Sequence, residues 1–264
     1  MESQPPVVLT IAGSDSGGGA GIQCDLKTFA ALECYGASVV TAVTSQNTQA
    51  VRDVFPMPAT VVGLQLACVL EDLPVAAVKI GMLATADIAA CVAARARAGD
   101  LPNLVLDPVL TATTGRRLGV VSAVERLLPY ATVVTPNVDE ASALLGWEVS
   151  TPTDMAGAAT QLASRGAQCV VVTGGDLGGE ESVDALWTPL GVRMLRAPRL
   201  KTRNTHGTGC TFSAAIAARL AHGYPVEDSV DFAKRFVRAA LAGSAEWRLG
   251  SGAGPLNHFF GRLP

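Results

Sequence analysis

Two segments of the chain carry residues whose types and spacing are suited to holding a phosphate group. One is a glycine-rich run from Gly13 to Gly21, directly after a short apolar segment, and the other is residues 204–210, Asn-Thr-His-Gly-Thr-Gly-Cys. Glycines at the opening of a helix leave the first backbone N–H groups free, and the helix dipole favours an anion there. We therefore expect an anion site made by Gly207, Thr208, Gly209 and Cys210. For the first run, a tight turn that packs a helix on a strand is an equal alternative to ligand binding.

The thiol of Cys210 could take part in chemistry at this site. A helix N-terminus lowers the pKa of a thiol, so we predict that Cys210 holds more thiolate than an ordinary cysteine and can accept a proton. The alternative is a small residue at the start of a helix. His206, four residues earlier, is equally compatible with an ordinary loop histidine.

A third segment, Thr-Pro-Asn-Val-Asp-Glu at residues 135–140, follows an expected strand. Asn137 and Glu140 are three residues apart on a first helical turn, so both can face one spot and reach a hydrated magnesium ion. Helix capping, with Asn137 as the cap and Glu140 three residues on, is a strong competing interpretation. We predict a magnesium requirement on the first interpretation.

Apolar segments of strand length alternate with segments of helical periodicity along most of the chain. Expected strands are residues 7–12, 37–43, 76–80, 104–106, 132–135 and 169–173. Helices lie between them, with Ser122 and Thr153 as expected caps, and the chain is expected to end in helices after a helix over 211–221. Helices that connect successive buried strands predict one α/β domain over residues 1–264, with a mostly parallel sheet covered by helices on both faces. Residues 183–187 and 192–197 predict a small antiparallel hairpin at the edge of this sheet. Ligands bind beyond the carboxyl ends of such strands, where loops 107–121 and 198–209 could close over them.

Composition excludes several classes of protein. The 264 residues are 49% hydrophobic and 16% charged with a net charge of −3, which disfavours disorder and offers no basic field for nucleic acid. No signal-like N-terminus and no membrane-length apolar run is found, so we expect a cytoplasmic protein without a membrane partner. The six cysteines form no Cys-x-x-Cys pair, which disfavours disulfides and a zinc site.

The motifs together resemble a known family. Residues 9–23 with 25–29, 41–43 with 46–48, 79–83, 106–109, 135–137 with Glu140, and 204–210 occur in the order found in hydroxymethylpyrimidine/phosphomethylpyrimidine kinases. These are the thiamin-pathway members of the ribokinase-like family. The resemblance spans nearly the whole chain and implies a ribokinase-like fold, a kinase that uses ATP and Mg²⁺, and a homodimer.

The resemblance also assigns roles to individual residues. Residues Gly207 to Cys210 would hold the transferring phosphoryl group, with Cys210 where most ribokinase relatives carry an aspartate base. The pyrimidine would contact Gly13, Asp25, Gln46, Met82 and Val109, with Gln46 making polar contacts to the aminopyrimidine edge. ATP would contact Thr173, Gly175, Asn137, Gly207 and Gly209, and magnesium would contact Glu140 and Asn137. The family often has lysine before the Gly-Gly of the sixth strand, where this chain has Thr173.

The expected activity is phosphorylation of 4-amino-5-hydroxymethyl-2-methylpyrimidine and then of its monophosphate, giving the diphosphate used in thiamin biosynthesis. A pyridoxal or pyridoxine kinase is the main alternative, because both substrates are flat heteroaromatic rings with a hydroxymethyl arm. The missing lysine is the one hint of a non-catalytic pyrimidine sensor. A nicotinamide-binding oxidoreductase is disfavoured, because Gly-x-Gly-x-x-Gly cannot be placed in the glycine run.

Overall fold

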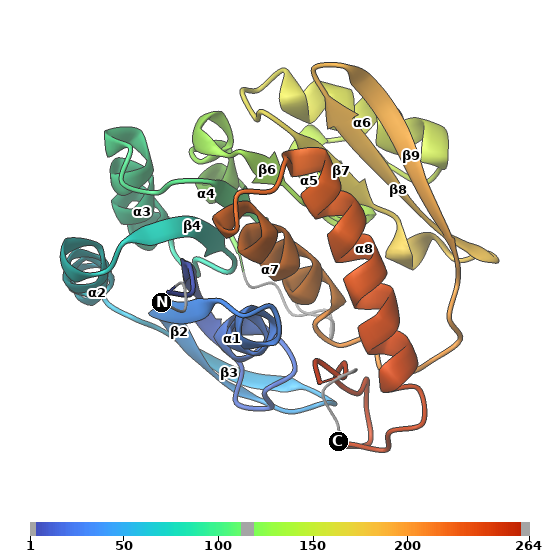
Figure 1. The fold of residues 1–264 in the computed structure, drawn as a ribbon, viewed down its shortest axis with the longest axis horizontal. Coiled ribbons are helices and arrows are strands. Elements are labelled where there is room, and N and C mark those ends of the chain that lie inside the picture. The colour runs from blue at the N-terminus through green and yellow to red at the C-terminus, as the bar shows by residue number, and fades with distance from the viewer. Residues whose placement is uncertain (1–3, 112–118, 260–264) are drawn as a thin grey trace.

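The computed structural model describes residues 4–111 and 119–259, which fold around a nine-stranded sheet (Figure 1). The strand order is β3-β2-β1-β4-β5-β6-β7-β8-β9. The strands are β1 (Val7–Ser14), β2 (Tyr35–Gln46), β3 (Val51–Pro56), β4 (Val75–Ile80), β5 (Leu104–Leu106), β6 (Val133–Val134), β7 (Val170–Thr173), β8 (Glu181–Thr188) and β9 (Gly191–Pro198).

Neighbouring strands from β2 through β7 in this order pair in parallel, and both edges of the sheet are antiparallel. The predicted hairpin is present as β8 and β9. The strand β3 at the opposite edge was not predicted. Most of its residues are half-buried or exposed, so no apolar periodicity marks it in the sequence.

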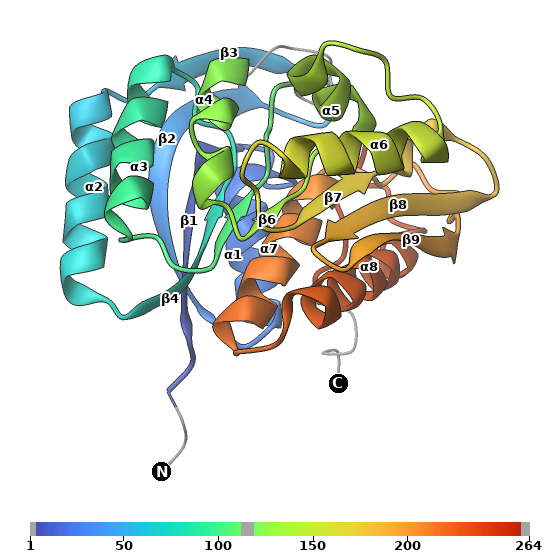
Figure 2. The same ribbon diagram turned by 90° about the horizontal axis from the view of Figure 1, so that it is seen from above.

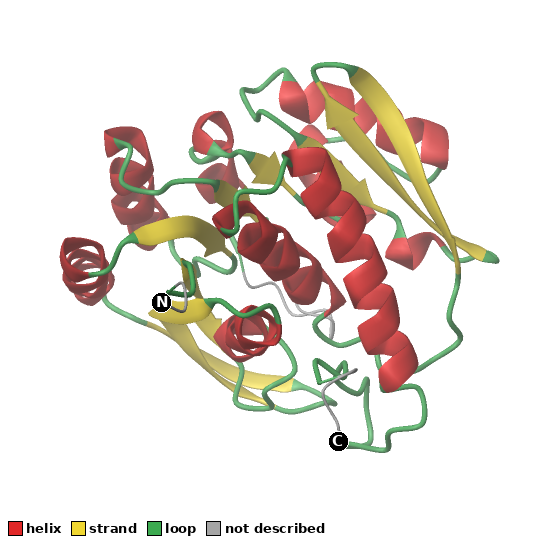
Figure 3. Cartoon of the chain, in the orientation of Figure 1, coloured by secondary structure: helices red, strands yellow, loops and turns green. Residues whose placement is uncertain are grey.

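Helices cover both faces of the sheet, as Figures 2 and 3 show. One face carries α1 (Gly21–Ala31), α7 (Thr208–Ala221) and α8 (Val226–Gly243). The other carries α2 (Ala59–Asp72), α3 (Ala86–Ala98), α4 (Val121–Glu125), α5 (Val138–Leu145) and α6 (Pro152–Ala163). Short 3₁₀ turns, η1 (Leu128–Tyr130) and η2 (Gly175–Leu177), complete the elements. The predicted α/β architecture is therefore confirmed.

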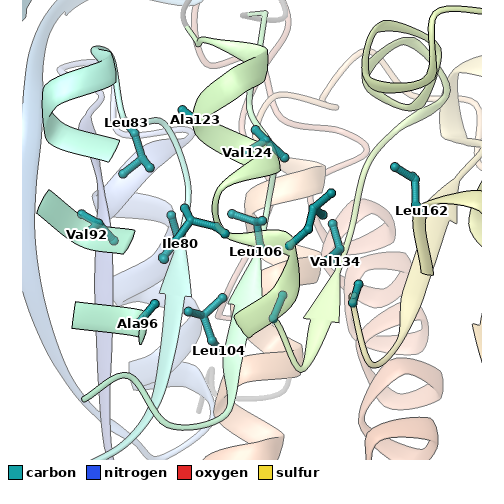
Figure 4. Packing of buried hydrophobic residues seen from close by; sticks show 14 of the residues in the cluster. Ile80, Leu83, Val92, Ala96, Leu104, Leu106, Ala123, Val124, Val134 and Leu162 are labelled. Atoms are coloured by element: carbon teal, nitrogen blue, oxygen red, sulfur yellow. The ribbon is translucent and has the colours of Figure 1, made fainter. Parts of the chain in front are cut away.

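Two apolar clusters, one on each face, hold the sheet in place. Figure 4 shows part of the first cluster, where Ile80 and Leu106 of the strands face Val92 of α3 and Val124 of α4. The second cluster packs Phe29 of α1 and the helices α7 and α8 against the opposite face. Burying each large side chain contributes about 1.5–3 kcal/mol, so these clusters fix the ends of the central strands from which the loops project.

Two expected helix caps are corrected by the structure. Thr151, not Thr153, caps α6: its hydroxyl accepts from the N–H of Asp154, and Pro152 takes the first helical position, where its missing N–H costs nothing. Ser122 lies inside α4, whose cap is Val120.

The C-terminal part of the chain also differs from the expectation. The helix α7 begins at Thr208, three residues before the expected start, so Cys210 belongs to its first turn. After α8 the described residues 244–259 contain no helix, and they return to pack beside the start of α7.

Of the expected loop over 107–121, residues 112–118 lie outside the described part of the chain. Within that part, no helix combines the length and apolar character needed to cross a membrane.

Candidate active site

The start of α7 lies where the carboxyl ends of the parallel strands meet. Gly207 is the N-cap with φ of 92°, and a Cβ there would collide with the carbonyl oxygen of Gly19. The N–H groups of Gly209 and Cys210 belong to the first turn, where backbone N–H groups lack intrahelical acceptors. A Cβ on Gly209 would meet no atom within 4 Å, so there is open space beside this turn. The arrangement is suited to an anion.

The two glycine loops are joined through Asp15 and His206. The Asp15 carboxylate accepts hydrogen bonds from the N–H groups of Gly17, Gly19 and Ala20 at 2.8–3.0 Å and from His206 Nε2 at 2.9 Å. Burial acts to raise the pKa of Asp15, but the hydrogen bonds from His206, Ala20 and Gly17 outweigh burial and hold this pKa below its usual value. Asp15 is therefore an anion that folds the first loop and holds the second against it.

Three of the expected pyrimidine contacts lie around these loops. The methyl group of Met82 occupies the space where a Cβ on Gly13 would stand, and Thr41 Oγ1 donates to the carbonyl of Met82 at 2.6 Å. Gln46, at the end of β2, places its amide nitrogen 3.4 Å from His206 Nε2. The Met82 side chain thus packs on Gly13, and the amide of Gln46 lies next to His206, which precedes the start of α7. Val109 is half-buried, and its carbonyl lies against Gly119.

Asp25, another expected pyrimidine contact, is enclosed in the protein. Its carboxylate is completely buried, with Lys79 Nζ 3.0 Å from Oδ1 and the Thr10 hydroxyl 2.6 Å from Oδ2. Burial is the main cause that raises the pKa of Asp25, and the charge of Lys79 opposes this effect. This carboxylate has no exposed surface in this structure, and its contact with the pyrimidine stays a prediction.

Lys79 links Asp25 to Asp107, whose Oδ2 lies 3.5 Å from the ammonium. Ser213 of α7 donates to the same Asp107 oxygen at 3.0 Å. Burial acts to lower the pKa of Lys79, but the negative charges of Asp25 and Asp107 outweigh burial and raise this pKa. A permanent ammonium is therefore fixed beneath the start of α7.

Asn137 and Glu140 form a capping box at the start of α5. Asn137 Oδ1 accepts from the Glu140 N–H at 2.8 Å, and Glu140 Oε2 accepts from the Asn137 N–H at 2.9 Å. Burial raises the pKa of Glu140 to about 8, with further contributions from the charges of Asp107 and Asp176. The capping interpretation is therefore correct, but Glu140 also lies close to the carboxylates of Asp107 and Asp176.

Of the expected nucleotide contacts, Thr173 is the last residue of β7 and Gly175 follows it closely; Thr173 lies beside Asn137 at the start of α5. The N–H of Thr173 donates to the carbonyl of Pro136, so the two segments run together. A Cβ on Gly175 would meet no atom within 4 Å. Arg199 donates to the carbonyl oxygens of Gly175, Gly178, Gly179 and Glu181 and thereby fixes the shape of this loop.

The pKa of Cys210 is opposite to the prediction. Burial raises the pKa of this thiol well above its usual value; the charge of Lys79 opposes the shift, and Asp107 and Asp25 add to it. The free N–H groups of the first helical turn favour a thiolate, but the thiol is half-buried in this structure with two carboxylates near it. In the absence of ligands it is protonated at neutral pH. All six cysteines are free in this structure.

Sequence reasoning assigned no role to four residues that shape this region: Asp15, Lys79, Asp107 and Ser213. Lys79 did carry a signal, since a lysine inside the apolar strand Val75–Ile80 must find a buried partner. The partners of Asp15 and Ser213 lie 191 and 106 residues away, so local sequence carries no sign of them.

Comparison with known proteins agrees with this geometry. Residues 15–257 match the family model described as phosphomethylpyrimidine kinase. The hydroxymethylpyrimidine/phosphomethylpyrimidine kinase of Rhizobium meliloti is 46% identical over 258 residues, covering 96% of this chain and 97% of the relative.

Solved structures of similar proteins have the same fold. An ADP complex of Bacillus subtilis pyridoxal kinase superposes with a TM-score of 0.89 at 40% identity, covering 98% of this chain and all of the other. Phosphomethylpyrimidine kinase from Clostridium difficile gives a TM-score of 0.78 at 36% identity, covering 89% of this chain and 99% of the other. The ribokinase-like fold expected from the sequence is confirmed.

Proposed function

Because this chain belongs to the phosphomethylpyrimidine kinase family, we propose that it transfers the γ-phosphoryl group of ATP to 4-amino-5-hydroxymethyl-2-methylpyrimidine and then to the resulting monophosphate. The product would be the diphosphate used in thiamin biosynthesis. One observation carries this proposal: the open N-terminus of α7 lies on the same side of the sheet as Gly13, Gln46 and Met82, at the carboxyl ends of the parallel strands. On this proposal, the phosphate site and the site for the flat ring would lie side by side there.

Phosphoryl transfer requires little covalent chemistry from the protein. The substrate hydroxyl oxygen forms a bond to the γ-phosphorus, the bond from that phosphorus to the bridging oxygen of ADP breaks, and the hydroxyl proton passes to water or to an oxygen of the transferred phosphoryl group. The backbone N–H groups of Gly209 and Cys210 would hold the transferring group, with Lys79 as a fixed positive charge below. Positioning and charge stabilisation at the helix start would supply most of the rate, because the transition state is loose.

Cys210 lies where a proton acceptor would be useful, but its raised pKa makes it a weak one. We infer that the anion site at Gly207, Thr208, Gly209 and Cys210 acts mainly through backbone N–H groups. The thiol would then contribute a smaller part of the rate.

A divalent cation fits the acidic region around Glu140. The carboxylates of Asp107 and Asp176 lie near enough to add to the effect of burial and raise the pKa of Glu140, which is the electrostatic condition that a bound cation relieves. The described residues contain no group of three or more His, Cys, Asp or Glu side chains suited to a metal ion, so phosphate oxygens and water would complete the shell. Glu140 and Asp107 would hold Mg²⁺, and Asn137 would act through the cap. When bound, Mg²⁺ would neutralise triphosphate charge during transfer.

The nucleotide would lie along Thr173, Gly175 and Asn137 and reach Gly207 and Gly209 with its phosphates. Its space is the open region beside Gly175, in the loop held by Arg199. We further propose a cytoplasmic homodimer, on the basis of the family resemblance.

Pyridoxal is the second candidate substrate. The likeness to the pyridoxal kinase of Bacillus subtilis favours it, because that enzyme matches this chain over nearly its full length. The wall of Gly13 and Met82 would accept either flat ring.

A coupled assay of ADP release with the hydroxymethylpyrimidine, its monophosphate and pyridoxal tests these proposals side by side. We expect turnover with both pyrimidines and a lower kcat/KM with pyridoxal. Turnover with pyridoxal alone would reverse the assignment. Binding of the pyrimidine without any ADP release would favour the non-catalytic sensor.

A further inference from the structure

The described residues after α8 form a segment that has neither helix nor strand and is nevertheless partly buried. This C-terminal segment, residues 244–258, is drawn in red below the end of α8 in Figure 1. Its buried residues include Gly254, Leu256, Asn257 and His258. Irregular segments usually run over the surface, because a buried one must find partners for its backbone polar groups. Several partners of this segment lie around the start of α7.

The C-terminal segment holds the residues that lead into α7. The side-chain NH₂ group of Asn204 donates to the carbonyl oxygens of Ser244 at 2.5 Å and Trp247 at 3.2 Å. The N–H of His206 donates to the carbonyl oxygen of Gly254 at 3.0 Å. A Cβ on Gly254 would stand 1.9 Å from Asn204 Oδ1, so the two segments are in close contact. The chain just before the anion site is therefore bound to the C-terminal segment.

His258 is bound to the first turn of α7 itself. Its Nε2 lies 3.0 Å from Thr211 Oγ1, and both side chains are buried. The same hydroxyl oxygen lies 3.1 Å from Cys24 Sγ. The N–H of Thr211 donates to the carbonyl of Gly207 at 2.8 Å and closes the turn that carries the anion site. Burial is the main cause that lowers the pKa of His258 to about 4, so its ring is neutral at neutral pH and adds no charge to that site.

The C-terminal segment also reaches the loop after β2. The N–H of Gly252 donates to Thr48 Oγ1 at 3.2 Å, and a Cβ on Gly252 would stand 1.8 Å from the carbonyl oxygen of Thr48. Gln46, at the end of β2, precedes this loop and is an expected pyrimidine contact. One segment is thus bonded to the loop on the proposed ring side and to the helix start on the proposed phosphate side.

We propose that His258 is a positioning residue for phosphoryl transfer, which fixes the first turn of α7 through Thr211 while its segment holds the loop after β2. The role of Gly207 to Cys210 as the anion site comes from the proposed function, on which this inference rests. His258 then keeps that site aligned with the ring side. Because a misplacement on the order of 1 Å can cost about 100-fold in rate, loss of this bond should lower kcat more than it weakens the binding of either substrate.

Thr211→Val removes the hydroxyl with little change of shape, and His258→Leu removes the ring from the other side. We expect each variant to lower kcat about tenfold, with less than about a threefold change in the KM for the pyrimidine and for ATP. His258→Gln should stay within about threefold of the wild-type kcat, because its amide offers either a donor or an acceptor to Thr211. Thr211→Val decides the question if His258→Leu does not fold. A folded Thr211→Val enzyme with wild-type kcat would overturn the proposal.

A double-mutant cycle and a matched control separate positioning from a loss of stability. In the Thr211→Val background, His258→Leu should change kcat by less than about twofold, because its partner is already absent. Asn257→Ala is the control, since Asn257 is buried next to His258 but bonds to the carbonyl of Gly243 at the end of α8. It should lower the urea midpoint and leave kcat within about threefold of the wild type. Additive effects in the cycle, or an equal loss of kcat in Asn257→Ala, would overturn the positioning role.

Hydrogen exchange separates this inference from the proposed function, because it needs no turnover. The N–H groups of His206 and Thr211 are bonded to Gly254 and Gly207. We expect both to exchange about tenfold faster in His258→Leu, with no change in α3. If the wild-type protein transferred no phosphoryl group, the proposed function would fail, but faster exchange at these two groups would still show that His258 orders the helix start. Unchanged exchange would overturn the inference whatever the activity.

Discussion

Asp25 and Glu140 are two buried carboxylates near the carboxyl ends of the parallel strands. The charges of the side chains around them have opposite signs. Asp25 lies 3.0 Å from the buried ammonium of Lys79 and accepts from the hydroxyl of Thr10. Glu140 accepts from backbone N–H groups, but the side-chain charges around it, Asp107 and Asp176, are negative. Asp25 therefore has its counter-ion inside the protein, whereas no positively charged side chain is among the groups that shift the pKa of Glu140.

The difference separates a structural charge from one prepared for a ligand. Asp25 is completely buried against the ammonium of Lys79, so we infer that it stabilises the fold beneath the site. A carboxylate whose pKa is raised to about 8 is destabilised in its charged form, and a bound cation reduces this destabilisation. The following variants test this distinction.

Lys79→Met should give the largest effect, on stability. Removing the ammonium leaves the carboxylates of Asp25 and Asp107 buried together without a counter-ion, and breaking such a pair costs about 3–5 kcal/mol. Urea denaturation would measure the loss. The matched control is Lys201→Met at an exposed position, where we expect a change below about 0.5 kcal/mol. A loss of less than about 1 kcal/mol for Lys79→Met would mean that the triad is not a structural unit.

Glu140→Gln should lower kcat about 100-fold, equivalent to about 2.7 kcal/mol, because it removes charge from the proposed magnesium site. Folding should be preserved, since glutamine can still accept from the N–H of Asn137. Asp139→Asn is the control, because Asp139 lies next to Glu140 on α5 but is exposed. Full activity of Glu140→Gln at low magnesium concentration would refute the assignment.

The pH dependence of stability tests the same carboxylate without a substrate. The pKa of Glu140 is about 8 in the folded protein against an ordinary value of 4.5, so the folded state holds this proton more tightly. Its stabilising contribution is complete below pH 4.5 and is lost as the pH rises through 8, by about 5 kcal/mol in total. The free energy of unfolding of the wild type, minus that of Glu140→Gln, should fall between pH 5 and pH 8. A difference that stays constant over this range would show that Glu140 is not destabilised as an anion.

Cys210→Ala should have the smallest effect, a loss of kcat of about tenfold or less, because a protonated thiol contributes little as a general base. Iodoacetamide should modify Cys210 slowly at neutral pH and faster as the pH rises, since the pKa of the thiol is raised. Cys210→Asp should show whether a carboxylate at this position increases the rate. If Cys210→Ala lost more than about 100-fold in kcat, the general-base role predicted from the sequence would be restored.

The architecture could be predicted from the sequence because its causes are local. Buried parallel strands such as Val75–Ile80 are apolar runs, and the helices between them show their periodicity. The strand β3 was missed because both its faces are largely solvated, and the cap of α6 was misplaced by two residues although Pro152 marks the first helical position.

The site could be predicted only in part. Glycine loops and the pair of Asn137 and Glu140 are visible as patterns, but charge and burial depend on groups far apart in the chain. The pKa of Cys210 was predicted with the wrong sign because the helix N-terminus is a local feature, whereas the burial and the Asp25 and Asp107 charges that dominate are not. The enclosure of Asp25 by Lys79 likewise joins residues 54 positions apart.

The contact between the two glycine loops also bears on how the site forms during synthesis of the chain. Asp15 is made early, but its partner His206 follows 191 residues later, and the carbonyl of Gly19 meets Gly207 at a similar separation. Contacts of such long sequence separation form late, because closing a long loop costs entropy before any contact compensates for it. The central strands can pair while the ribosome is still adding the last quarter of the protein. We therefore expect a nascent chain that ends before α7 to contain much of the sheet but neither a complete ring site nor a phosphate site.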